Sequence, residues 1–545
     1  MSALTKGVRR RHVLLGSAAL AACKAPAGCG ARAGLELPLP PGQIVGQVER
    51  MGHVLRQMRE SPPWRDDAPT ERRRVVVVGG GVAGLACARS LRRGGISDVL
   101  VLELDDRAGG TATWGENATS AYPWGAHYVT LPLENGGAFG DFLVEAGACT
   151  RTPDGGLVGA ERALCREPEE RLYLSGAWHD GLWPSAGASA VEVHEFEQFR
   201  AKLDALSMEL RPNGTRLFRF PLADGSAFGA VGDALDKISA AAWLEQQSLV
   251  SPRLAWMINY ACRDDYGCLA KETSALAALA YFAGRLRAPG AEPQPVLSWP
   301  AGNGHLVQAL AKGAEIRGGA LVTAVHADGR LSGVDAHGKY MQVACESVVV
   351  TVPSFIAARI VQGEPDHVRN ARMSLSYAPW WVANLTLSEH PANGRGGGVP
   401  IAWDNVMYDS VSVGYVVATH AAGTDSGPTV MSYYMPMAGG DPAVRRQELL
   451  SASYENLAAQ CLDDLESAHP GIRNFVERIE IRKWGHAMVR PVPGLLSSPG
   501  LAQLRAAHGK VHYAHTDLSG LALFDEAFAH GERAAAEVRY ALQKS

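Results

Sequence analysis

The sequence predicts an α/β fold, in which a parallel sheet with packed helices is combined with a second, α+β part. Val75–Val78 is an unbroken β-branched run of the kind found in a strand buried on both faces. Gly79, Gly81 and Gly84 follow as G-x-G-x-x-G, and an apolar helical run, 85–91, begins directly after them. In this pattern one glycine turns the chain, one lets a diphosphate approach the backbone, and one packs the helix on the strand.

A second strand and an acidic residue complete the unit. Residues 98–102 are mostly apolar and end at Glu103, about 20 residues beyond the last glycine, where a carboxylate is placed for ribose hydroxyls. The order of strand, glycines, helix, strand and acid therefore predicts a Rossmann-like dinucleotide domain. The alternative is a glycine-rich turn in an unrelated α/β protein.

The residues after this acid indicate which dinucleotide binds. Glu103, Arg107, Gly109 and Gly110 form E-x-x-x-R-x-G-G, which resembles an extension in the flavin amine oxidase and phytoene desaturase superfamily that wraps the FAD diphosphate. An arginine adds a forked cationic donor there, and a glycine pair lets the chain turn tightly. The resemblance implies a Rossmann-like FAD-binding domain.

The composition and charge of the chain limit the kinds of ligand and partner that we expect. The chain has 545 residues, of which 47% are hydrophobic and 20% are charged, as in globular proteins with a large core. A net charge of -4 gives no reason to expect nucleic acid. The cysteines lack C-x-x-C spacing, so no metal site is expected. Cys262 and Cys268 are a candidate disulfide if the compartment is oxidising.

Residues 1–23 predict an export signal. Arg9–Arg11 precede an apolar run, 13–22, which is too short to span a bilayer. Arg10 and Arg11 resemble a twin-arginine signal, which exports proteins already folded around a cofactor. The residues before Cys23 resemble a lipobox, so we expect a periplasmic protein, or one anchored on the outer side of the bacterial inner membrane through a lipidated Cys23. The alternative is an ordinary cleaved signal; residues 24–71 are expected to be a linker.

The resemblance continues in separated segments, and implies an FAD-binding domain at 72–153, 296–369 and 476–545. Gly125 to Tyr128, G-A-H-Y, resembles the segment beneath the flavin ring, although His127 has the alternative of only bonding backbone. Residues 299–307 resemble the family's glycine-rich turn, and the strands predicted at 320–325 and 347–352 its second crossover, ending at Thr351–Pro353. The expected cofactor-binding residues are Gly79, Gly81, Gly84, Glu103, Arg107, Gly109, Gly110, Gly125, Val325 (backbone, to adenine) and Asp517 (to the ribityl chain).

The segment near the C-terminus completes the family pattern. Residues 511–517 resemble the final strand and its acid, and the helix that follows is expected to point its N-terminus at the flavin. Trp484 to Met488, W-G-H-A-M, resembles the region that brings an aromatic wall towards the flavin. No cysteine lies there, so non-covalent FAD is expected.

Residues 154–295 and 370–475 are expected to form the α+β substrate domain. Strands are predicted at 381–387 and 429–434, and one long helix at 444–467. Asp264 and Asp265 lie in an R-D-D-Y run beside an apolar helix; they are candidates for holding a cationic amine, or for solvated charges at a helix end. Many amine oxidases place a lysine on the first of these strands, where this chain has Asn384 instead.

Three functions are consistent with these patterns. The first is FAD-dependent oxidation of an amine-bearing carbon, with oxygen or another acceptor taking the electrons. The second is desaturation or isomerisation of an apolar, carotenoid-like substrate, and the third is non-catalytic flavin binding. All three leave a small molecule as the expected partner. The candidate residues around the substrate are His127, Asn384, Trp484, His486 and Phe524.

Overall fold

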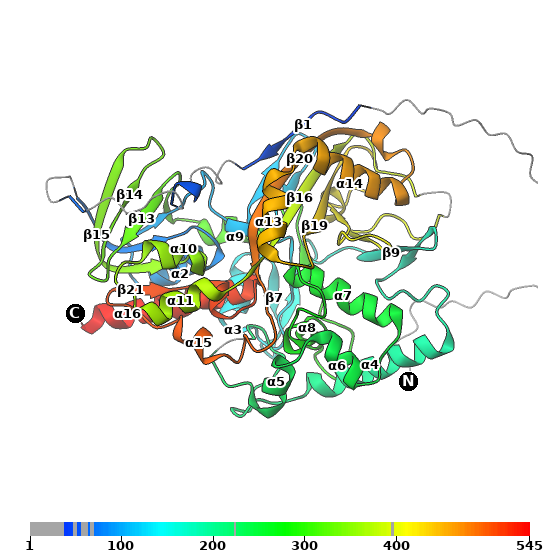
Figure 1. The fold of residues 1–545 in the computed structure, drawn as a ribbon, viewed down its shortest axis with the longest axis horizontal. Coiled ribbons are helices and arrows are strands. Elements are labelled where there is room, and N and C mark those ends of the chain that lie inside the picture. The colour runs from blue at the N-terminus through cyan, green and yellow to red at the C-terminus, as the bar shows by residue number, and fades with distance from the viewer. Residues whose placement is uncertain are drawn as a thin grey trace, which may run out of the picture.

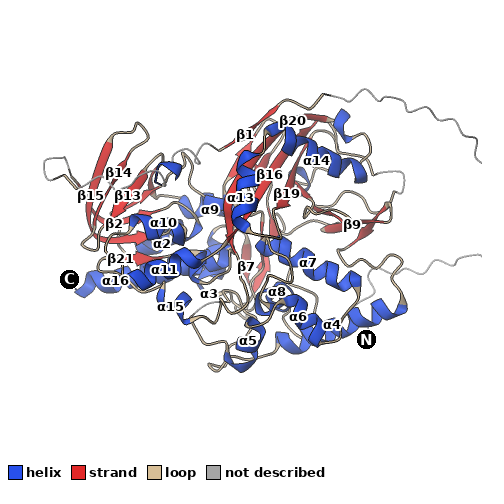
Figure 2. Cartoon of the chain, in the orientation of Figure 1, coloured by secondary structure: helices blue, strands red, loops and turns tan. Residues whose placement is uncertain are grey.

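A computed structural model of the protein describes residues 38–46, 52–55, 64–65, 70–222, 225–393 and 397–544. It contains two large sheets and a helical lobe (Figures 1 and 2). The predicted export signal with Cys23, and most of the predicted linker, lie outside the described residues. Within the described ranges no helix is both long and apolar enough to cross a membrane.

The first sheet has seven strands and carries the predicted dinucleotide unit. Its order is β12-β3-β2-β15-β14-β13, and β21 also pairs with β15. Val75 of β2 lies opposite Val99 of β3 on one side and Ser347 of β15 on the other, and both pairings are parallel. This confirms the predicted α/β fold with a Rossmann-like domain. The strands are β2 (Glu71–Val78), β3 (Val99–Leu102), β12 (Glu315–Arg317), β13 (Leu321–Val325), β14 (Arg330–Val334), β15 (Tyr340–Val350) and β21 (Val511–Tyr513).

Helices cover both faces of this sheet because both faces of β2 are apolar. Val75 and Val77 pack into the core under one group of helices, whereas Val76 and Val78 pack into the core on the other face. The first group is α2 (Val82–Arg93), α3 (Gly137–Glu145), α9 (Gly304–Ala311) and α16 (Phe524–Lys544). The second group is α10 (Ser354–Ile360), α11 (Asp366–Ser374) and α15 (Pro499–Gln503).

The second sheet has eight strands in the order β1-β20-β16-β19-β18-β17-β9-β10. On β16, Trp381 and Ala383 pack on the core beneath α14, whereas Trp380 and Val382 face the opposite side. The strands are β1 (Gly42–Val45), β9 (Glu170–Leu174), β10 (Ala177–Asp180), β16 (Tyr377–Leu387), β17 (Asp404–Met407), β18 (Tyr415–Val417), β19 (Thr429–Pro436) and β20 (Val476–Val489). The helices over this sheet are α12 (Ala418–Ala421), α13 (Pro442–Ser451) and α14 (Tyr454–Ala468).

A helical lobe packs below the second sheet in the view of Figure 1. It contains α4 (Ala190–Ser207), α5 (Gly229–Asp236), α6 (Ala240–Gln246), α7 (Pro252–Tyr266) and α8 (Ala275–Ala283). Three two-stranded antiparallel sheets complete the fold: β4 (Trp114–Glu116) with β5 (Ala121–Pro123), β6 (Tyr128–Thr130) with β11 (Val296–Ser298), and β7 (Cys149–Arg151) with β8 (Leu157–Gly159). Short 3₁₀ turns lie at η1 (Gly110–Ala112), η2 (Ile472–Asn474) and η3 (Thr516–Leu518).

The structure differs from the sequence-based expectations in several elements. The single helix predicted at 444–467 is two helices, because Ser453 caps a new one by accepting a hydrogen bond from Asn456 N. Gly42–Val45, inside the predicted linker, pairs with β20 as β1. β20 itself was assigned to the FAD-binding domain, yet it pairs within the eight-stranded sheet. Cys262 and Cys268 are buried free thiols, so the candidate disulfide is not formed.

Candidate active site

The glycine turn at the end of β2 leaves space beside the N-terminus of α2. At Gly84 an added Cβ would lie 2.0 Å from Gly79 O, so this glycine packs the helix against the turn. At Gly81 a Cβ would meet only Gly110 Cα, at 3.9 Å. Gly81 and Gly109 pair as an isolated bridge, which brings the second glycine pair alongside the turn. The backbone is therefore accessible where a diphosphate would meet the helix N-terminus.

Glu103 and Arg107 lie at the same turn. Glu103 accepts hydrogen bonds from Gly80 N at 2.5 Å and Asp105 N at 2.9 Å, and burial raises its pKa. The Arg107 guanidinium lies 4.5 Å from the centre of the Trp114 ring and donates to Trp114 O. The carboxylate keeps acceptor capacity for ribose hydroxyls. Glu103 therefore fits the ribose of a dinucleotide, whereas Arg107 packs on Trp114 and its contact with the diphosphate stays a prediction.

Asp517 and Val325 are held by protein contacts. Asp517 Oδ2 accepts from Ser354 N and from Tyr377 Oη, both at 2.6 Å. Burial alone would raise the pKa of Asp517, but His515 and these hydrogen bonds outweigh burial and hold the pKa below its usual value. Asp517 Oδ1 is buried and lies 3.1 Å from His515 Nδ1, and a carboxylate oxygen keeps a second lone pair that a cofactor hydroxyl could use. Val325 O accepts a hydrogen bond from Gln362 N at 2.8 Å.

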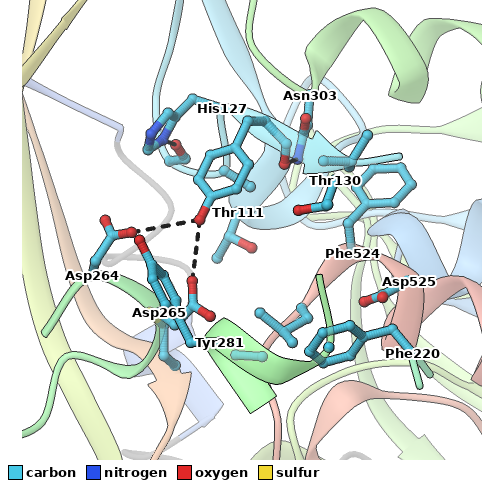
Figure 3. A pocket seen from close by; sticks show the side chains of 18 of the residues that line it. Thr111, His127, Thr130, Phe220, Asp264, Asp265, Tyr281, Asn303, Phe524 and Asp525 are labelled. Atoms are coloured by element: carbon cyan, nitrogen blue, oxygen red, sulfur yellow. Dashed lines mark hydrogen bonds between the residues drawn. The ribbon is translucent and has the colours of Figure 1, made fainter. Parts of the chain in front are cut away.

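A cavity of about 190 Å³ lies where β6, the end of α7, β16, β20 and the start of α16 meet. Its walls include Gly125 and three of the candidate substrate residues, His127, Trp484 and Phe524. Figure 3 shows the acidic residues Asp264 and Asp265 on one side of this space, with Phe524 and Asp525 across it. The cavity is thus formed by segments that are far apart in the sequence.

Two candidate residues do not line this cavity. Asn384 donates to Pro123 O at 3.0 Å and accepts a hydrogen bond from Ser432, so its amide is engaged by β5 and β19. Val382, two residues earlier on the same face of β16, lines the cavity instead. His486 stacks on Phe355, with ring centres 4.2 Å apart, at the contact between β20 and α10.

His127 is a neutral group at the cavity wall. Burial lowers its pKa to about 4, although a hydrogen bond with Gly125 O opposes the shift. Its Nδ1 lies 3.2 Å from Gly125 O, and its ring centre lies 4.6 Å from that of Tyr434. His127 therefore hydrogen-bonds to backbone, as the alternative interpretation of this residue expects, and it also lines the cavity.

The cavity also contains a polar network that sequence reasoning recognised only in part. Asp264 and Asp265 end α7, and Tyr128 Oη lies 3.5 Å from Asp264 Oδ2 and 3.3 Å from Asp265 Oδ1. Arg285 Nη2 donates to Tyr128 Oη at 3.0 Å. Asp265 is only 8% exposed, so a solvated helix end does not describe it, whereas Asp264 is partly exposed; both line the cavity. Sequence reasoning missed Arg285 and Asp525, and it placed Tyr128 only in the segment beneath the flavin ring, because these contacts join distant parts of the chain.

A Rossmann-like domain with an accessible glycine turn, together with an aromatic cavity, fits a dinucleotide-dependent oxidoreductase. Comparisons agree: residues 77–146 match the NAD(P)-binding Rossmann-like domain, and residues 232–539 match the flavin containing amine oxidoreductase family. The chain belongs to the flavin containing amine oxidoreductase family. It is therefore an FAD-dependent oxidoreductase, as the sequence motifs predict.

The chain also resembles individual proteins over most of its length. The chain is 26% identical over 520 residues to the "Putative flavin-containing monoamine oxidase AofH" of Mycobacterium tuberculosis, covering 88% of this chain and 97% of that protein. The structure resembles a putrescine oxidase bound to putrescine, with a TM-score of 0.63 at 19% identity over 87% of this chain and 100% of that one. It also resembles a fatty acid isomerase from P. acnes, with a TM-score of 0.58 at 15% identity over 85% and 98% of the two chains.

Proposed function

We propose that this protein oxidises the amine-bearing carbon of a small molecule with non-covalently bound FAD. The observation that carries this proposal is a pair of carboxylates, the buried Asp265 and the partly exposed Asp264, which both line a cavity with aromatic walls. Carboxylates attract an ammonium group strongly where water is scarce, and aromatic rings enclose its hydrocarbon part. Bound FAD would supply the chemistry, which is acceptance of a hydride from the carbon next to nitrogen.

The chain's own residues would hold the cofactor and orient the substrate. Gly81, Gly109 and the α2 N-terminus would hold the diphosphate, and Glu103 the adenosine ribose. Trp484 donates to Trp124 O at 2.6 Å, which fixes its indole as a cavity wall. The described residues that line the cavity include no cysteine, which supports non-covalent FAD. His127, being neutral, would act as a hydrogen-bonding wall rather than as a cation.

The acidic residues of the cavity also favour amine oxidation over desaturation or isomerisation of an apolar substrate. A desaturase or isomerase for an apolar substrate would bring hydrocarbon against Asp264, Asp265 and Asp525, which all line the cavity. Removing polar groups from water without replacing their hydrogen bonds costs roughly 1–3 kcal/mol each. A substrate with a hydrogen-bonding cation avoids this cost, so the cavity favours amines over polyenes.

The experiment is an anaerobic titration of the purified flavoprotein. Pools of monoamines, diamines, amino acids and polyenes are added while flavin absorbance is recorded, with matched alcohols as controls. We expect bleaching by an amine pool and not by its alcohol analogues. Hydrogen peroxide formed after air is admitted would identify oxygen as an electron acceptor. Bleaching by polyenes alone would contradict amine oxidation and favour the alternative.

We also propose that the protein is exported and anchored through Cys23. The support is the arginine pair Arg10–Arg11, the short apolar run after it and the lipobox-like residues before Cys23. In a bacterial host, Arg10→Lys with Arg11→Lys should retain the protein in the cytoplasm, and Cys23→Ser should release it from the membrane fraction. An unchanged distribution of both variants would contradict export and anchoring, respectively.

A further inference from the structure

We infer that Asp264 and Asp265 act as one proton-accepting unit, which takes a proton from the ammonium group of the substrate before the neighbouring carbon is oxidised. This inference rests on the proposed function, because it requires an amine substrate. It assigns a catalytic role to two residues, and a positioning role to Tyr128 and Arg285.

The geometry joins the two carboxylates through one hydroxyl. Tyr128 Oη lies 3.5 Å from Asp264 Oδ2 and 3.3 Å from Asp265 Oδ1. Dashed lines mark the hydrogen bonds that reach Asp264 and Asp265 in Figure 3. A phenol has a single proton to donate, so only one carboxylate can receive it at a time. Arg285 donates to the same Tyr128 oxygen at 3.0 Å and therefore orients the hydroxyl proton away from itself, towards the pair.

The carboxylates are open to a donor in the cavity. Asp265 is 8% exposed, and only its Oδ1 receives a hydrogen bond from the described residues. In the part of the chain that the structure describes, neither carboxylate forms an ion pair with a lysine or arginine. Arg263, on the same helix, turns away and donates to the carbonyl oxygens of Ser410, Val411 and Ser412. The other oxygen of Asp265, on a residue that lines the cavity, can therefore accept a hydrogen bond from a ligand there.

The surroundings make the pair more basic than ordinary aspartates. Burial raises the pKa of both carboxyl groups, and the charge of Asp265 adds to the rise at Asp264; Arg285 and the Tyr128 hydroxyl oppose it only partly. Asp525, at the start of α16, has a pKa raised to about 6 by burial and is influenced by Asp265. His127 shares the cavity with the pair. The other titratable groups that interact with the pair are Glu170, Tyr260, Cys262, Arg263, Tyr266, Tyr281, Asp404 and Tyr434.

The proton must leave because hydride transfer needs the nitrogen lone pair. Near neutral pH a simple aliphatic amine is an ammonium ion, whose lone pair is bound to a proton. In the proposed step an N–H bond breaks, the proton moves to a carboxylate oxygen of the pair, and the electron pair stays on nitrogen. That lone pair can then form the C=N bond as hydride leaves the carbon. The carboxylic acid returns its proton to solvent when product leaves.

Rapid anaerobic reduction of the flavin at a series of pH values tests this step. With an amine that reduces the wild type, Asp264→Asn, Asp265→Asn and the double variant should be slowed by about 10²–10⁴-fold near pH 7. The deficit should shrink as pH passes the pKa of the free amine, because the substrate then arrives neutral. Asp409→Asn, an exposed carboxylate outside the cavity, is the matched control. A deficit that does not change with pH would overturn proton acceptance.

A binding measurement gives a readout without turnover. The holoprotein is titrated with a primary amine that has no hydrogen on its α-carbon, and with the alcohol of the same shape. In the wild type, affinity for the amine should rise with pH over the range in which Asp264 and Asp265 ionise, because only ionised carboxylates attract the ammonium group. Affinity for the alcohol should not change with pH. The Asn variants should lose the rise. A flat amine profile in the wild type would overturn the inference even if the variants do not fold.

The two proposals fail in different ways. If no amine reduces the wild-type flavin, amine oxidation is wrong. If amines reduce the wild type and the Asn variants follow the same rate profile as the wild type, amine oxidation stands and the proton-accepting pair is wrong.

Discussion

Gly81 and Gly84 lie three residues apart, and each position needs a glycine for a different reason. A methyl group at Gly84 would collide with Gly79 O, whereas one at Gly81 would meet no protein atom closer than 3.9 Å. We predict that Gly81→Ala folds normally but retains FAD poorly, because the methyl group occupies the approach to the diphosphate. The flavin-to-protein absorbance ratio after gel filtration should fall, with affinity lowered about tenfold for each 1.4 kcal/mol lost.

Gly500→Ala is the matched control, since its added Cβ would meet nothing closer than Ser498 Oγ at 3.4 Å, far along the chain from the glycine turn. Equal flavin content in the two variants would show that the diphosphate does not lie beside Gly81.

Tyr128 partly offsets the rise that burial causes in the pKa of Asp264 and Asp265. Its hydroxyl stabilises the ionised carboxylates and so lowers the pKa of both Asp264 and Asp265. We predict that Tyr128→Phe raises the pKa of the pair, so the ionised form appears only at higher pH. The midpoint of the acid limb in a plot of flavin reduction rate against pH should move upward. An unmoved midpoint with a uniformly lower rate would indicate that Tyr128 only shapes the cavity.

Sequence reasoning succeeds at the residue scale where function depends on neighbours in the chain. Gly79 to Gly84 and Glu103 form one local pattern, so their meaning is visible in the sequence. Tyr128 meets Asp265 across 137 positions and Arg285 across 157, so their contacts follow only from the packing of β6 against α7 and α8. The acid pair was recognised as unusual, but its burial was not readable.

At the scale of the element, the end of α7 positions the acid pair. The helix stops at Gly267, whose φ of 64° is left-handed, and an added Cβ there would lie 2.3 Å from Trp380 Nε1 on β16. We predict that Gly267→Ala destabilises the protein by more than the roughly 1–2 kcal/mol expected of left-handed backbone alone. It should also slow flavin reduction, because relief of the clash moves Asp264 and Asp265.

Gly290→Ala separates strain from packing, since Gly290 has a φ of 71° and no atom within 4 Å of an added Cβ. Chemical denaturation of both variants should give the larger loss at Gly267. Equal losses and equal reduction rates would mean that contact with β16 does not hold the helix end.

Strand β16 shows why element patterns alone did not locate every residue. Its alternation was readable, and Val382 and Asn384 do share a face. Which of the two side chains reaches the cavity depends on β5. Pro123 O of β5 accepts a hydrogen bond from the Asn384 side-chain amide, so β5 covers that end of the strand. Similarly, the break between α13 and α14 depends on a Ser453 cap within a run that otherwise continues as helix.

At the scale of the whole molecule, the sites expected to contact FAD come from distant parts of the chain. The glycine turn follows β2. Thr351, at the end of β15, donates a hydrogen bond to Gly79 O over 2.7 Å, and Asp517, which precedes α16 in the chain, accepts one from Ser354 N. β20, which carries Trp484, pairs in the other large sheet. A cofactor held by all these segments would link the two sheets.

We therefore predict that FAD is a major source of stability. Removing the flavin should lower the melting temperature, and returning FAD at about 100 times its dissociation constant should restore about 2.7 kcal/mol, since only the folded chain offers the complete site. Apo Gly81→Ala should melt with the wild-type apoprotein but gain much less from the same FAD. If saturating FAD left the wild-type melting temperature unchanged, these segments would not share one cofactor site in the folded protein.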